Sequence, residues 1–74
     1  MKTIYYLAFY EGGQFSHYIG QPYEHRAEAL AAITAYYLSL SEIFELRQNG
    51  ADCFTYNRYG TPCMVCIEEK EESL

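Results

Sequence analysis

The segment KTIYYLAFYEGGQ, residues 2–14, decides the fold that we expect for this chain. Its first nine residues are mostly β-branched or aromatic, as is typical of a strand. Residues 11–14 then supply the positive φ angles that a tight hairpin turn needs. Side chains alternate along a strand, and both faces of this one are apolar: Tyr5, Leu7 and Phe9 on one, Ile4, Tyr6, Ala8 and Tyr10 on the other. A strand with water on one side normally alternates apolar and polar residues, and this strand does not, so we expect apolar side chains on both faces of the sheet.

A second strand, Phe15–Ile19, is expected to return beside the first and to end at Gly20-Gln21-Pro22, because proline removes a backbone donor. From Glu24 the apolar residues recur at spacings of three and four, which predicts an amphipathic helix that stops at Asn49-Gly50. This apolar stripe consists of Leu30, Ile33, Tyr37, Leu40 and Phe44.

A continuous helix over this stretch would be longer than the rest of the domain. About 24 residues make a helix of roughly 36 Å, whereas a compact chain of this size is about 30 Å across. Either one long helix overhangs the sheet, or the helix bends at residues 39–42, where Ser39 and Glu42 match a capping box.

The second half of the chain repeats the hairpin pattern. Cys53–Tyr59 and Cys63–Glu69 read as strands, and Gly60-Thr61-Pro62 reads as the turn between them. The order ββαββ predicts an α+β fold, in which an antiparallel four-stranded sheet carries one long or bent helix on one face. We expect residues 1–74 to form a single domain, with residues 70–74 as a frayed acidic tail.

One helix covers only one face of such a sheet, so the other face should expose aromatic side chains. Nine of the thirteen aromatic residues are tyrosines, which combine a large apolar ring with a polar hydroxyl and are frequent at interfaces. An exposed aromatic patch marks a binding surface for a partner or for a second copy of the chain. The residues that we assign to this aromatic face are Tyr6, Tyr10, Tyr18 and Tyr56.

The charge of the chain is acidic and unevenly distributed. Ten acids oppose five bases, and seven of the acids lie in residues 42–74. Five scattered cations are too few for direct nucleic-acid binding, which depends on several phosphate contacts. An acidic surface instead attracts basic protein grooves, although such charge also serves solubility alone. The candidate acidic residues for partner binding are Glu42, Glu45, Asp52, Glu68, Glu69, Glu71 and Glu72.

The cysteines and histidines give weak indications of chemistry. Three cysteines without a secretory signal predict free thiols in a reducing compartment, the cytoplasm. Cys63 and Cys66 would point to opposite faces of a strand, so buried cysteines are favoured over a zinc or redox module there. Neighbours on a strand face apart, which argues against Ser16 and His17 as a nucleophile and base. We therefore expect no catalytic residue, metal or cofactor. We also expect no membrane span, because no stretch approaches the roughly 20 apolar residues that a span needs.

In size and format the chain resembles the small phage-encoded inhibitors known as anti-CRISPR proteins. The resemblance is carried by the start Met1-Lys2-Thr3-Ile4-Tyr5-Tyr6, the hairpin and helix through Phe44, and the acidic end Glu68–Glu72. It implies binding to a CRISPR effector subunit inside a bacterial cell, with an acidic surface taking the place of DNA. That group shares no fold or residue pattern, so no site residue is transferred. The alternative is a homo-oligomeric structural or regulatory domain that pairs through the tyrosine-rich sheet face.

Overall fold

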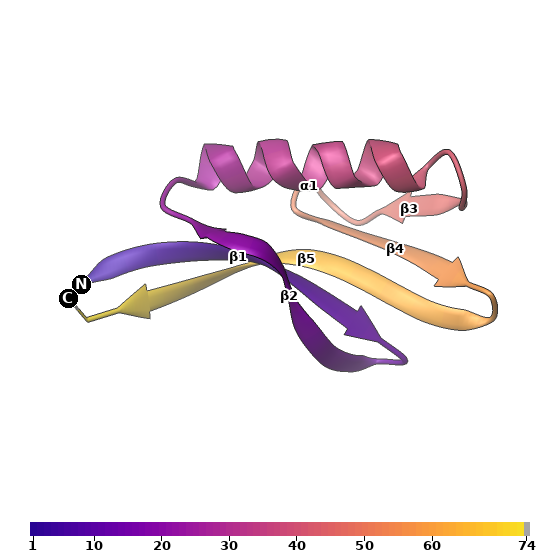
Figure 1. Cartoon of the computed structure of the whole chain (residues 1–74), viewed down its shortest axis with the longest axis horizontal. Coiled ribbons are helices and arrows are strands. Elements are labelled where there is room, and N and C mark those ends of the chain that lie inside the picture. The colour runs from indigo at the N-terminus through magenta and orange to yellow at the C-terminus, as the bar shows by residue number, and fades with distance from the viewer. Residues whose placement is uncertain (74) are drawn as a thin grey trace.

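The computed structural model describes residues 1–73 as an α+β fold, with one helix on one face of an antiparallel sheet (Figure 1). The elements are β1 Lys2–Glu11, β2 Gln14–Tyr23, α1 Arg26–Leu40, β3 Leu46–Gln48, β4 Cys53–Arg58 and β5 Thr61–Glu72. The five strands lie in the order β2-β1-β5-β4-β3. The predicted α+β class, antiparallel sheet and single helix are confirmed, whereas the predicted number of strands was one too few.

The extra strand arises because α1 ends at Leu40, well before Asn49-Gly50. The backbone N–H groups of Ile43 and Phe44 both donate to the Leu40 carbonyl at 2.9 Å, which turns the chain back toward the sheet. Leu46–Gln48 then pairs with β4 as β3. Neither a long helix nor a second helical segment forms, because these residues satisfy their backbone groups in the sheet. No helix in the described residues has the length and apolar composition that a membrane span requires.

Two hairpin turns place residues in the left-handed region. Gly12 and Gly13 have φ of 62° and 82° between β1 and β2, as the glycine pair predicts. Between β4 and β5 the turn residues are Tyr59, at φ 51°, and Gly60, at φ 93°, one position earlier than expected. The Asn57 side chain accepts a hydrogen bond of 2.7 Å from the Gly60 N–H. A tyrosine in this region is strained by about 1–2 kcal/mol.

Strand β5 is the centre of the sheet and is longer than expected. It pairs with β1 along a register that runs from Glu11 opposite Cys63 to Lys2 opposite Glu72, and it pairs with β4 on its other side. Residues 70–72, which were expected to fray, are therefore part of the sheet, while Leu74 lies outside the described residues. The N-terminal strand supplies the backbone partners that hold this charged segment in place.

The core lies between α1 and the face of the sheet that carries Leu7 and Phe9 on β1. It contains Leu7, Phe9, Ile33, Phe54, Tyr56, Cys63 and Val65. Val65 is fully buried and the ring of Tyr37 meets that of Phe54 edge to face at 5.2 Å. Tyr56, which we assigned to the exposed aromatic face, is only 7% exposed. That assignment was wrong because Phe54 and Tyr56 alternate onto the helix side of β4.

Candidate functional site

The sheet face opposite α1 carries a cluster of four aromatic rings. Tyr6 and Tyr10 alternate along β1, and Phe15 and Tyr18 come from the neighbouring β2. Ring centroids are 4.6 Å apart for Tyr6 and Tyr18, 4.9 Å for Phe15 and Tyr18, and 5.7 Å for Tyr10 and Phe15. Ala8 points to this side and is fully buried, so the side chains around it form a packed layer without a helix. We call Tyr6, Tyr10, Phe15 and Tyr18 the aromatic cluster.

Two glutamates of β5 hold the hydroxyl groups of this cluster. The register places Glu68 opposite Tyr6 and Glu72 opposite Lys2, four residues further along β5 and on the same face. Tyr10 donates a hydrogen bond to Glu68, and Tyr18 donates to the other oxygen of Glu68 at 3.4 Å. Tyr6 donates to Glu72 at 2.6 Å. The aromatic cluster together with Glu68 and Glu72 is named the tyrosine–glutamate face.

The carboxylates keep the phenols in their neutral, donating form. The hydrogen bond to Glu72 raises the pKa of Tyr6, and the hydrogen bond to Glu68 raises the pKa of Tyr10. A carboxylate that accepts from a phenol opposes the loss of its proton, because a second negative charge would then lie beside the first. These hydroxyls are therefore fixed donors, and the rings that carry them are half-buried.

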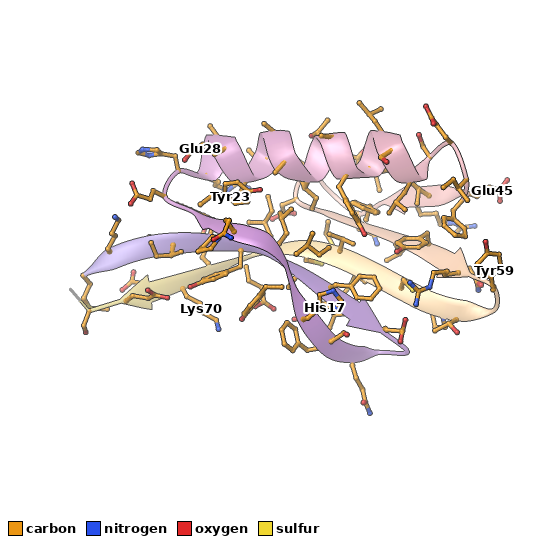
Figure 2. All side chains as sticks on the ribbon, in the orientation of Figure 1. His17, Tyr23, Glu28, Glu45, Tyr59 and Lys70 are labelled. Atoms are coloured by element: carbon orange, nitrogen blue, oxygen red, sulfur yellow. A yellow bond between two sulfur atoms is a disulfide. The ribbon has the colours of Figure 1, made fainter. Side chains whose placement is uncertain are left out.

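The Lys70 side chain lies over the tyrosine–glutamate face. Lys70 is on β5 between Glu68 and Glu72, and its Nζ is 4.8 Å from the ring centroid of Tyr18 and 5.5 Å from that of Tyr6 (Figure 2). The Tyr18 hydroxyl is the largest cause of a raised pKa for Lys70, so its ammonium group stays charged. The cation and the two rings meet in the geometry of a cation–π contact.

Three of the other predicted acidic residues lie away from this face. Glu69 and Glu71 alternate onto the opposite side of β5 from Glu68 and Glu72. Asp52 follows the β3–β4 turn and its carboxylate lies 3.8 Å from the guanidinium of Arg26 at the start of α1. None of them reaches the aromatic cluster.

The last two predicted acidic residues lie at the other end of the molecule. Glu42 and Glu45 follow the end of α1, next to β3. The molecule is 41 Å long, and Figure 2 shows Glu45 and Lys70 toward opposite ends of that axis. The structure therefore does not join the seven acids into one surface, and it brings only Glu68 and Glu72 together with the predicted tyrosines.

A hollow of about 940 Å³ adjoins the tyrosine–glutamate face at the β3 side. Its walls come from the β1–β2 hairpin, the segment after α1, and strands β3, β4 and β5, and they are mainly apolar. Tyr10 belongs both to this hollow and to the aromatic cluster, which makes the two regions continuous. Glu45 and Arg47 are the charged residues among its lining.

The cysteines differ from the expected free thiols. Cys53 and Cys66 lie directly opposite each other on β4 and β5 and form a disulfide, while Cys63 is free and buried on the helix side. Cys63 and Cys66 are on opposite faces, as expected, so they do not assemble a paired zinc or redox site. Within residues 1–73 no group of three or more histidine, cysteine or acidic side chains is placed to hold a metal.

Ser16 and His17 meet, contrary to the expectation that neighbours on a strand face apart. The Ser16 Oγ is 2.9 Å from the His17 Nδ1. The register of β1 and β2 shifts between Phe9 and Tyr10, and this bulge frees Ser16 from regular alternation. Both residues are exposed, and among the described residues no carboxylate hydrogen-bonds the histidine. The pair lacks the third group that orients a catalytic base.

Comparison with known proteins finds no family model, no curated protein and no solved structure that matches this chain. Its function is therefore inferred from its own geometry.

Sequence reasoning missed two members of the site. Phe15 was assigned only to a strand, and Lys70 was placed in the frayed tail. A signal for Lys70 existed in the spacing Glu68-x-Lys70-x-Glu72, which puts three charges on one face of a strand. The role of Phe15 depends on the bulge in β2, which has no clear mark in the sequence.

Proposed function

We propose that this chain is a small protein-binding domain that acts by binding rather than by catalysis, through its tyrosine–glutamate face. The observation that supports this proposal is a set of tyrosine hydroxyls that donate hydrogen bonds to Glu68 and Glu72. These tyrosines lie on the sheet face opposite α1, the helix of the described residues. Rings that are already held in place lose little conformational freedom on binding. Tyrosine is also among the residues that contribute most to binding energy at protein interfaces.

The chemistry of this face fits a basic partner. The chain carries a net charge of −5, and two carboxylates lie beside aromatic rings. Lysine and arginine side chains of a partner can stack on the rings and pair with the carboxylates. The partner that we propose is a basic nucleic-acid-binding protein or complex whose DNA site the chain occupies, as an inhibitor of the anti-CRISPR type would do in a bacterial cell.

Strand β5 offers a matched pair of variants to test this proposal. Glu68→Lys/Glu72→Lys reverses the two carboxylates on the tyrosine–glutamate face, and Glu69→Lys/Glu71→Lys makes the same charge change on the opposite side of the same strand. Both variants and the wild-type chain are used as bait in parallel pull-downs from a bacterial lysate, followed by mass spectrometry. The expected partner is retained by wild type and by the Glu69/Glu71 variant and is lost by the Glu68/Glu72 variant.

A partner found in this way is then tested for competition with DNA in a mobility-shift assay. Binding should weaken as salt is raised, because the contact is between opposite charges. Equal loss of the partner in both variants would show a general charge effect and would contradict a specific face. Retention of the partner by the Glu68/Glu72 variant would exclude this face from the interaction.

A second copy of the chain is the alternative occupant of the same face. Phe15 favours it, because this ring is 48% exposed next to Tyr18. In that case light scattering should detect a dimer whose stability changes little with salt, and Phe15→Ser should dissociate it. A monomer at high concentration would rule out this alternative.

A further inference from the structure

Lys70 occupies a defined place on the tyrosine–glutamate face without forming an ion pair. The salt bridges among the described residues are Lys2–Glu24, Arg26–Asp52 and Arg58–Glu11. Lys70 is in none of them, although it lies between Glu68 and Glu72 on the same side of β5. Its ammonium group instead sits over the rings of Tyr6 and Tyr18, at 5.5 Å and 4.8 Å from their centroids. Glu68, Glu72 and Lys70 together carry a net negative charge.

We propose that the pair of rings from Tyr6 and Tyr18, flanked by Glu68 and Glu72, is a binding site for an arginine side chain of the partner, and that Lys70 is an internal competitor for it. The inference rests on the proposed function, since it names the group of the partner that this face takes. Lys70 marks where a cation is stabilised, and its side chain is exposed.

The two rings form a suitable base for a guanidinium group. Their centroids are 4.6 Å apart and their planes are tilted by 31°, so the two rings pack against each other, and one cation beside the pair can contact both, as Lys70 does. Each ring carries a hydroxyl that donates to a carboxylate, which draws the proton outward and leaves more negative charge on the ring. A cation above these rings is therefore held more firmly than above an unbonded tyrosine.

Arginine fits this place better than lysine does. A guanidinium is planar, stacks on an aromatic ring and still directs several N–H donors sideways. It can lie over Tyr18 and hydrogen-bond Glu68 or Glu72 in the same position, whereas the ammonium of Lys70 forms no salt bridge with either. An incoming arginine thus gains an ion pair that the resident lysine lacks.

The test is a nuclear magnetic resonance titration of the whole chain with a short arginine peptide and with the matching lysine peptide. Wild type is compared with Lys70→Met and with Arg26→Met, which removes one positive charge at the start of α1, on the other face of the sheet. We expect the arginine peptide to shift the amide signals of Tyr6 and Tyr18. Lys70→Met should tighten its binding about two- to fivefold, which corresponds to one exposed cation–π contact, and Arg26→Met should change it less.

Three results would overturn the inference. The first is equal tightening in Lys70→Met and Arg26→Met, the second is a lysine peptide that binds as well as the arginine peptide, and the third is a set of shifts that avoids Tyr6 and Tyr18. Tyr18→Leu should weaken the arginine peptide, and the two methionine variants keep the test valid if that substitution disturbs folding. If the peptide binds as expected but no partner depends on Glu68 and Glu72, the arginine site stands and the proposed function fails. If a partner depends on them but the peptide does not bind, only this inference fails.

Discussion

Substitution by alanine should lower the unfolding free energy more at Tyr56, on the covered face of the sheet, than at Tyr18, on the open face. Tyr56 is 7% exposed and packs between Phe44 and Phe54, with ring centroids at 5.3 Å and 6.2 Å. Removing a buried aromatic ring costs about 3–5 kcal/mol of unfolding free energy. A domain of 74 residues has about 4–11 kcal/mol in total, so Tyr56→Ala should lose a large part of its stability.

Tyr18→Ala should cost less. Tyr18 lies half-buried on the open face, and the substitution removes its ring contacts with Tyr6 and Phe15, which together are worth about 1–3 kcal/mol. Thermal unfolding followed by circular dichroism measures both variants. Tyr56→Ala should lower Tm by at least about 12 °C, since each kcal/mol corresponds to about 4–8 °C in a domain of this size. A Tyr56→Ala variant as stable as Tyr18→Ala would place Tyr56 outside the core and refute the assignment of the covered face.

Three further outcomes follow from single residues. Tyr59→Asn should raise the unfolding free energy by about 1 kcal/mol, because asparagine tolerates a positive φ better than tyrosine; a decrease in chemical denaturation would contradict the strain. Desolvation raises the pKa of Tyr56 from 10.0 to about 12, so the stability that this tyrosine contributes is complete below pH 10 and is lost toward pH 12; an ultraviolet titration in which it ionises with the exposed tyrosines would disprove its burial. Alkylation in denaturant without reductant should label Cys63 alone, and prior reduction should add Cys53 and Cys66; three labels in the mass spectrum before reduction would exclude the disulfide.

The local signals in the sequence were sufficient for the class of fold and for the turn of the first hairpin, whereas β2 runs past its expected end at Gly20-Gln21-Pro22 to Tyr23. Gly12-Gly13 marks a turn that needs two positive φ angles, and β1 is apolar on both sides because α1 covers one face and the aromatic cluster fills the other. The start of α1 is also marked locally, since the Glu28 side chain accepts a hydrogen bond from the His25 N–H at 3.2 Å. Each of these features depends on residues close together in the chain.

The end of α1 could not be predicted in the same way. Ile43 and Phe44 continue the apolar spacing of the helix, yet Phe44 packs on Tyr56 from a turn. The competing arrangement, in which Leu46–Gln48 pairs with β4, depends on a strand that comes later in the sequence. Periodicity describes which residues are buried, and it does not distinguish between a helix and a turn that buries the same side chains. The disulfide was missed for a related reason, because Cys53 and Cys66 become neighbours only through the register of β4 and β5.

The acidic end of the chain shows how the same limit affects the candidate site. A run of glutamates normally reads as solvated and frayed, but pairing with β1 makes residues 68–72 a strand and so divides their side chains between two faces. Glu68 and Glu72 then lie within reach of tyrosine hydroxyls, whereas Glu69 and Glu71 face the other way. The strand pairing brings tyrosine hydroxyls to Glu68 and Glu72 as hydrogen-bond donors, and these two carboxylates in turn hold the tyrosine side chains in place. The sequence suggests an acidic surface and an aromatic surface as two separate sites. Because of this strand pairing, Glu68 and Glu72 belong to the same surface as the tyrosines.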